Sequence, residues 1–146
     1  MISCDTNILF PACDSKAPQH ASSRAFLVEH AGNADFCLCE QVLMELYCLL
    51  RNPAVCRSPL SASDAVQVIQ GFRSNPHWRI VDVVLGSDIM KQVWPVAAET
   101  GFAYRRIFDV RLAMTLRHNG VTELATRNKK DFDGLGFLRV WDPLVA

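Results

Sequence analysis

Short apolar segments alternate along this chain with longer segments whose apolar residues recur at helical spacing. Few residues between them can form tight hairpins, so consecutive strands are expected to be joined by helical crossovers. We therefore predict an α/β fold, a three-layer α/β/α sandwich around a mostly parallel sheet of about five strands. The expected strands cover residues 2–4, 36–39, 79–85, 123–126 and 137–141.

The segments between these strands carry helix signals. Apolar periodicity predicts helices over 20–30 and 41–51, and a capping box at 61–64 opens a helix that ends near 75–76. A further helix is expected to begin after Ser87 and to run toward Gly101, with Pro95 either kinking it or starting a second segment. A basic loop should then span 101–108, and a helix should cover 109–118 before the turn at Asn119-Gly120.

Composition fits one compact domain over residues 1–146. Half of the residues are hydrophobic and 21% are charged, which is enough for an independent core. The chain has no basic segment followed by a long apolar stretch at its start, and no apolar run approaches about 18 residues. A cytoplasmic protein without a membrane segment is therefore expected. The six cysteines form no CxxC pair, so we interpret them as reduced, buried side chains.

Four carboxylates occur where this alternation would bring them together. Asp5 follows the first strand, Asp131 lies shortly after the fourth, Asp109 should open the helix before the fourth, and Glu45 borders the apolar stripe of the 41–51 helix. Sites in parallel α/β folds lie beyond the carboxyl ends of the strands. Crowded anions in a partly dry cleft need neutralising, and oxygen ligands favour Mg²⁺ or Mn²⁺.

Each acid also has a structural interpretation. Asp5 and Asp109 could cap helices, Asp131 could belong to a surface turn, and Glu45 could reach solvent or pair with an arginine. The combination of all four, rather than any one, favours a cation site.

Net charge is zero, but the two parts of the chain differ. Residues 1–100 hold 7 Lys/Arg and 10 Asp/Glu, whereas 101–146 hold 8 and 5. This C-terminal excess could form a rim that faces phosphates, or it could be an ordinary solvated surface. The basic residues concerned are Arg105, Arg106, Arg111, Arg117, Arg127, Lys129 and Lys130.

The acids lie in stretches that resemble the PIN-domain ribonucleases, in particular the VapC toxins of toxin-antitoxin pairs. The similarity covers nearly the whole chain. The matching stretches are ISCDTNILF, QVLMELYCLLRNP, FDVRLAMTLRHNGVTELATRNKKDF and FLRVWDP.

The resemblance implies a divalent-metal-dependent ribonuclease acting as a toxin, with Mg²⁺ or Mn²⁺ held at Asp5, Glu45, Asp109 and Asp131. Asp5 and Asp109 would be the principal ligands, the other two completing the shell directly or through water. It also implies a cognate VapB-type antitoxin that blocks the acidic cleft, and a homodimer.

Polar residues beside the acids match further positions of the family. Asn7 and Thr126 match positions that line the same cleft, and Arg127 could guide the RNA backbone. The family often has an aspartate where this chain has Asn128, which leaves open whether one ion or two bind. Asn128 could hold a water molecule there by hydrogen bonding.

Other functions fit the residues less well. A phosphatase of the haloacid-dehalogenase type needs an acid where this chain has Asn7, and a nucleotide-binding domain needs a glycine-rich turn that residues 5–15 lack. A non-catalytic RNA- or partner-binding PIN-like module is the remaining alternative, and metal titration would distinguish it from a nuclease.

Overall fold

A computed structural model describes residues 1–85 and 88–145 of the chain. The centre of this described part is a five-stranded sheet with the order β3-β2-β1-β4-β5, and all of its neighbouring strands run parallel. The predicted parallel α/β fold is therefore confirmed. The strands are β1 (Ile2–Cys4), β2 (Phe36–Cys39), β3 (Arg79–Val81), β4 (Glu123–Ala125) and β5 (Arg139–Trp141).

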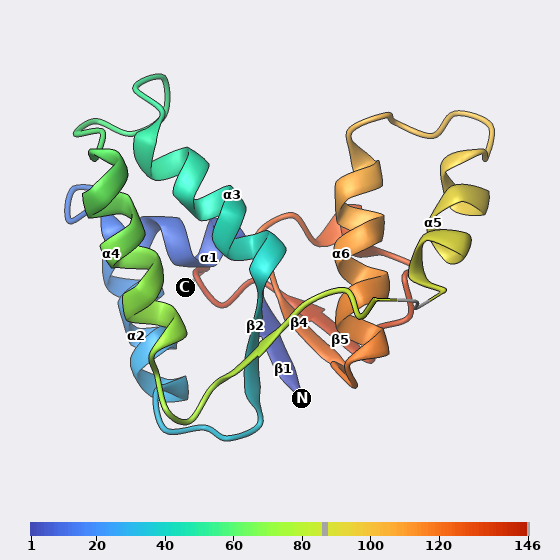
Figure 1. Ribbon diagram of the computed structural model, residues 1–146, viewed down its shortest axis with the longest axis horizontal. Helices are drawn as coiled ribbons and strands as arrows, with labels where there is room; N and C mark the ends of the chain where they lie inside the picture. Colours follow the sequence, from blue (N-terminus) through green and yellow to red (C-terminus); the bar gives the residue numbers. More distant parts are fainter. Residues whose placement is uncertain (86–87, 146) are drawn as a thin grey trace.

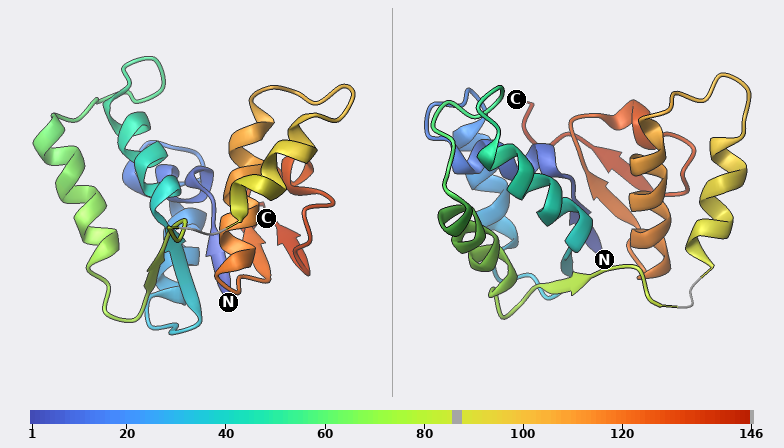
Figure 2. Two further views of the ribbon diagram at one scale, coloured as in Figure 1. Left: turned by 45° about the vertical axis from the view of Figure 1, so that its right-hand side comes forward. Right: turned by 45° about the horizontal axis from the view of Figure 1, so that its top comes forward.

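Helices lie on both sides of this sheet. Figure 1 shows α1 to α4 gathered on one side and α5 with α6 on the other, and the two views of Figure 2 keep the groups apart. Within the described residues no helix is both long and apolar enough to cross a lipid bilayer. The helices are α1 (Thr6–Leu9), η1 (Phe10–Cys13), α2 (His20–His30), α3 (Glu40–Arg51), α4 (Ala62–Arg73), α5 (Ile89–Ala97), α6 (Arg106–His118) and η2 (Lys129–Phe132).

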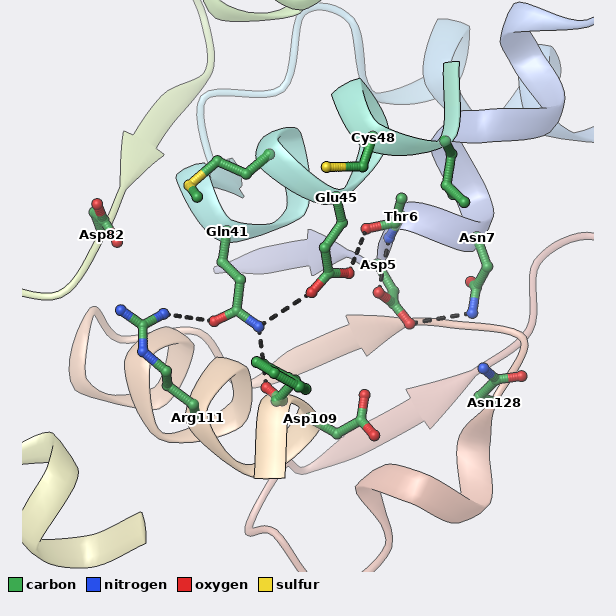
Figure 3. Close-up of a pocket in the computed structure, with 13 residues that line it drawn as sticks. Asp5, Thr6, Asn7, Gln41, Glu45, Cys48, Asp82, Asp109, Arg111 and Asn128 are labelled. Atoms are coloured by element: carbon green, nitrogen blue, oxygen red, sulfur yellow. Dashed lines mark hydrogen bonds between the residues drawn. The ribbon is translucent and has the colours of Figure 1, made fainter. Parts of the chain in front are cut away.

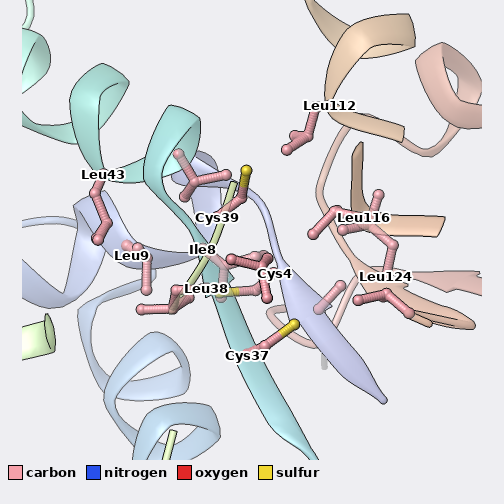
Figure 4. Close-up of a cluster of buried hydrophobic side chains, with 14 of the residues drawn as sticks. Cys4, Ile8, Leu9, Cys37, Leu38, Cys39, Leu43, Leu112, Leu116 and Leu124 are labelled. Atoms are coloured by element: carbon pink, nitrogen blue, oxygen red, sulfur yellow. The ribbon is translucent and has the colours of Figure 1, made fainter. Parts of the chain in front are cut away.

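The central strands are covered on both faces, which explains their continuous apolar sequence. All four residues of β2 are buried, and leucines of α3 and α6 pack over the sheet from different elements (Figure 4). All six cysteines are free thiols, and Cys4, Cys37 and Cys39 belong to this core. The prediction of buried, reduced cysteines holds for Cys4, Cys37, Cys39 and Cys56, whereas it was wrong about the burial of Cys13 and Cys48, which are exposed.

Several predicted boundaries were wrong. The strand expected over 123–126 ends at Ala125, and the helix expected to run toward Gly101 ends at Ala97. The strand expected over 79–85 ends at Val81, because its partner β2 ends at Cys39, where α3 takes over the chain. The strand expected over 137–141 begins only at Arg139, since β4 offers three residues for pairing. The helix expected over 109–118 begins earlier, at Arg106, whose N–H already donates to the Ala103 carbonyl at 2.9 Å.

Asp109 consequently lies within the first turn of α6 and does not open the helix. The start expected for α5, Ser87, lies outside the described residues. Pro95 lies inside α5, within the single helix Ile89–Ala97.

The order in which the strands are added to the sheet reverses beside β1. From β1 the chain moves to β2 and β3 on one side, and then crosses to β4 and β5 on the other side. Because Cys4 pairs with Ala125, the next residues, Asp5 and Thr126, leave the sheet side by side. Ligands of parallel α/β proteins bind at such switch points.

Candidate active site

A cavity of about 710 Å³ opens beyond the carboxyl ends of the strands. Figure 3 shows Glu45 descending from α3, Asp5 from the end of β1 and Asp109 from α6 toward this cavity. We call it the acid pocket. It is lined by Asp5, Thr6, Asn7, Gln41, Met44, Glu45, Cys48, Leu49, Asp82, Phe108, Asp109, Arg111 and Asn128.

Asp5 is the most enclosed acid of the pocket, with 7% of its surface exposed. It is the N-cap of α1, as its structural interpretation predicted, and its Oδ1 accepts the Thr6 N–H at 2.7 Å. Its Oδ2 accepts from Thr126 Oγ1 at 2.9 Å and from Asn7 Nδ2 at 3.1 Å. Three donors therefore fix the Asp5 carboxylate, and Figure 3 shows those of Thr6 and Asn7.

Thr126 and Asn7 tie the segment after β4 to the segment after β1. The Thr126 hydroxyl donates to Asp5 and accepts from Asn7 Nδ2 at 3.2 Å and from the Asn128 N–H at 3.1 Å. A hydroxyl has one donor and two acceptor sites, so all are used. The Asn7 oxygen accepts the Arg127 N–H at 3.1 Å, which brings the backbone of Arg127 to the site.

Replacing Thr126 by valine is expected to lower the free energy of unfolding by about 1–3 kcal/mol. The substitution takes the acceptor from the Asn128 N–H, and it removes one hydrogen bond each from the Asn7 amide and the buried Asp5 carboxylate. Urea denaturation would measure the loss. Thr122→Val, at an exposed threonine before β4, is the matched control and should change little. Equal stability of the two variants would contradict a supporting role for the Thr126 hydroxyl.

Glu45 is held from two directions. Its Oε2 accepts from Thr6 Oγ1 at 3.0 Å, and its Oε1 accepts from Gln41 Nε2 at 3.3 Å. Asp109 approaches from the opposite wall and is half-buried. The sequence predicted that four carboxylates converge, and the pocket gathers three of them from three separate elements.

Burial and mutual repulsion disfavour the charged forms of two of these acids. Burial raises the pKa of Asp5 to about 6, aided by the negative charges of Glu45 and Asp131 and opposed by its hydrogen bonds. Burial also raises the pKa of Asp109 to about 7, with the charges of Asp5, Asp131 and Glu45 adding to it. The pocket is thus electrostatically strained at neutral pH.

Protein cations relieve little of this strain in residues 1–85 and 88–145, where neither lysine nor arginine forms an ion pair with Asp5, Glu45 or Asp109. The charge of Arg106 offsets only part of the rise in the pKa of Asp109. Oxygen donors of this kind suit a hard divalent ion. No group of three or more His, Cys, Asp or Glu side chains among those described is spaced to hold one ion together. The donor chemistry thus fits Mg²⁺ best with one or two direct carboxylates and water elsewhere, as is usual for Mg²⁺.

Asp131 differs from the other three acids. It lies on η2 and does not line the acid pocket, although its charge contributes to the raised pKa values of Asp5 and Asp109. Its backbone carbonyl accepts from Arg106 Nε at 3.2 Å, which ties η2 to α6.

Several lining residues were not predicted from the sequence. Thr6 lies inside the DTN stretch, and Gln41 precedes Glu45 by one helical turn, a spacing that signals a side-chain pair. Asp82 directly follows β3, so the rule that found Asp5 would have found it as well.

The fold and the acid pocket together define a PIN domain. No family model matches the chain. It is 51% identical over 146 residues to Ribonuclease VapC24 from two strains of Mycobacterium tuberculosis, CDC 1551 / Oshkosh and ATCC 25618 / H37Rv, with 100% of this chain and 99% of each relative covered. The chain therefore belongs to the VapC family of PIN-domain ribonucleases.

Solved structures of low sequence identity share the fold. Mycobacterium tuberculosis VapC20, a sarcin-ricin loop cleaving toxin, aligns with a TM-score of 0.68 at 18% identity over 94% of this chain and 97% of that one. VapBC2 from Rickettsia felis, bound to a DNA fragment from their promoter, aligns with a TM-score of 0.67 at 21% identity over 97% and 100%. FitAcB from Neisseria gonorrhoeae aligns with a TM-score of 0.67 at 20% identity over 100% of both chains.

Proposed function

We propose that this protein hydrolyses RNA phosphodiester bonds with the help of a divalent cation and acts as the toxin of a toxin-antitoxin pair. The single observation that carries the proposal is the meeting of Asp5, Glu45 and Asp109 around one pocket, where no lysine or arginine of the described residues forms an ion pair with them. We take residues 1–146 as one nuclease domain and the cytoplasm as its location.

Asp5 and Asp109 are proposed as the direct ligands of Mg²⁺ or Mn²⁺, with Glu45 and Asp131 acting through water. When bound, the ion would lower the pKa of a water molecule and stabilise negative charge on the phosphoryl oxygens. Glu45, whose two oxygens are held by Thr6 and Gln41, is our choice for accepting the proton of the attacking water.

The polar residues around Asp5 are proposed to position the reacting groups. Thr126 and Asn7 hold the Asp5 carboxylate, and Asn128 lies at the edge of the pocket, where its amide can hold a water molecule or a phosphate oxygen. Arg127 is exposed beside it and is proposed to contact the RNA backbone.

A VapB-type antitoxin is the proposed protein partner. Besides the VapBC2 structure, the similar structures include DNA-bound VapBC from Salmonella typhimurium. A second cavity, of about 400 Å³, lies between α3 and α4 and shares Met44 and Cys48 with the acid pocket. Met44 is 67% exposed, so this continuous apolar surface suits a partner segment that also covers the acids. A homodimer is proposed from family membership.

Incubation of the purified protein with total RNA tests this function. Cleavage is expected with Mg²⁺ or Mn²⁺ and should stop when EDTA is added, because the carboxylates alone cannot supply the charge stabilisation. RNA that is bound but stays intact with either ion would instead favour the non-catalytic binding module.

A further inference from the structure

Gln41 connects two walls of the acid pocket. It lies on α3, one helical turn before Glu45, and its Nε2 donates to Glu45 Oε1 at 3.3 Å and to the Phe108 carbonyl at 3.0 Å. Its Oε1 accepts from Arg111 Nη1 at 2.6 Å. Phe108 directly precedes Asp109, so this one side chain joins the helix that carries Glu45 to the helix that carries Asp109 (Figure 3).

Arg111 decides which way the Gln41 amide points. A guanidinium can only donate hydrogen bonds, so the amide oxygen of Gln41 must face it. The amide N–H groups are then left for Glu45 and for the Phe108 carbonyl, both of which can only accept. If the amide were reversed, its N–H₂ group would face the donors of Arg111. Its oxygen would then face the oxygens of Glu45 and of the Phe108 carbonyl. Arg111 therefore locks Gln41 in the orientation that holds Glu45.

The same contacts keep Arg111 away from the acids. Its guanidinium is bound to a neutral amide, and it forms no ion pair with Glu45 or Asp109 in the part of the chain that the structure describes. The positive charge therefore borders the acid pocket without neutralising it. This arrangement leaves the negative charge of the carboxylates available to a bound cation.

Glu45 receives its second restraint from Thr6, whose backbone N–H donates to Asp5. A continuous series of hydrogen bonds thus runs from Arg111 through Gln41, Glu45 and Thr6 to Asp5. Each oxygen of Glu45 accepts one hydrogen bond and retains a lone pair that can face an ion or its water. The relative positions of Glu45 and Asp5 depend on this series.

We propose that Gln41 is a positioning residue for the divalent-ion site and that Arg111 acts as the lock on its amide. This inference rests on the proposed function, because it concerns the carboxylates to which the ion is assigned. Gln41 holds Glu45 and, through the Phe108 carbonyl, the backbone beside Asp109, which is assigned as a direct ligand. Partners that orient metal-ligating groups typically contribute 10- to 100-fold to metal affinity. Neither residue needs to touch the ion.

The test measures ion binding rather than cleavage. Gln41→Met keeps the length of the side chain but removes its donors and acceptor. Titration of the full chain with Mn²⁺, followed by electron paramagnetic resonance, is expected to show binding about 10- to 100-fold weaker than wild type. Gln92→Met, at an exposed glutamine of α5, is the matched control and should bind Mn²⁺ as wild type does.

Arg111→Met separates positioning from simple electrostatics. Removing a positive charge beside a cation site should strengthen ion binding if Arg111 acts only through its charge. The lock predicts the opposite, namely weaker binding. It also predicts that adding Arg111→Met to Gln41→Met brings little further loss, because both changes disable one restraint.

Unchanged Mn²⁺ affinity in a folded Gln41→Met protein would overturn the inference, and so would tighter binding by Arg111→Met. If Gln41→Met does not fold, the direction of the Arg111→Met effect decides alone. Failure of the proposed function would look different, because the wild-type protein would then neither bind Mn²⁺ nor cleave RNA. That result would also remove the basis of the inference.

Discussion

Replacing Asp109 by asparagine is expected to slow Mg²⁺-dependent RNA cleavage by about 100-fold or more. A metal ion at such a site supplies several kcal/mol of transition-state stabilisation, and each 1.36 kcal/mol lost corresponds to roughly tenfold in rate. Asparagine preserves the size of the side chain but not its charge. Cleavage of a labelled RNA under single-turnover conditions would measure the effect.

The same substitution is expected to make the ion-free protein more stable at neutral pH. Burial, together with the neighbouring negative charges, raises the pKa of Asp109 to about 7, so a neutral residue removes both a desolvation cost and the repulsion with Asp5 and Glu45. A rise in melting temperature in EDTA, together with lost cleavage, would separate a role in ion binding from misfolding. Asp133→Asn, at an exposed acid near η2, should change neither property. Full cleavage by Asp109→Asn would refute the assignment.

Asp109 is a better position for this test than Asp5. The oxygens of Asp5 accept hydrogen bonds from Thr6, Thr126 and Asn7, so an asparagine there would set an amide N–H₂ against at least one donor. Loss of activity in Asp5→Asn would therefore mix loss of the ion with loss of local structure. A decrease in its melting temperature is the expected sign of that second effect.

The sequence was most informative where structure depends on local signals. The strand at Ile2–Cys4 and the helix at His20–His30 have the predicted bounds, and the Ser61 hydroxyl caps α4 by accepting the Asp64 N–H at 3.1 Å. These features are set by short apolar runs, periodicity and capping within a few residues. The end of β3 was missed because it is set by the length of β2, which lies about 40 residues away in the sequence.

In the candidate site, too, some features follow from the fold class, whereas others depend on contacts between distant residues. Asp5, Glu45 and Asp109 could be brought together in advance because the carboxyl ends of parallel strands meet at one edge. The link between Gln41 and Arg111 spans 70 residues and depends on how two side chains point across the pocket. Asp131 was also predicted to join these acids; it lies on η2 and does not line the acid pocket, although its charge acts on both Asp5 and Asp109.

The stability of the ion-free protein is expected to fall as the pH rises from about 4 to about 7. The pKa of Asp5 is raised from 3.8 to about 6 in the folded state, so the folded protein retains a proton that the unfolded chain releases. Below pH 4 both states hold the proton and the effect is absent. Above about pH 7 the penalty contributed by Asp5 is complete, on the order of 3 kcal/mol for this nearly buried group. Asp109, whose pKa is raised to about 7, extends the fall to about pH 8.

Mg²⁺ should remove much of that penalty, because it binds the ionised carboxylates of the folded state. At an ion concentration of about 100 times Kd, binding raises the free energy of unfolding by roughly 2.7 kcal/mol. The free energy of unfolding in Mg²⁺ should therefore exceed that in EDTA by a large amount at pH 7.5 and by a small amount at pH 5. Urea denaturation at both pH values, with and without Mg²⁺, measures all four free energies of unfolding. Asp109→Asn should show a flatter dependence on pH and a smaller gain from Mg²⁺. The substitution changes the charge only inside the acid pocket. If Mg²⁺ stabilises this variant and the wild type equally, the ion therefore binds outside that pocket.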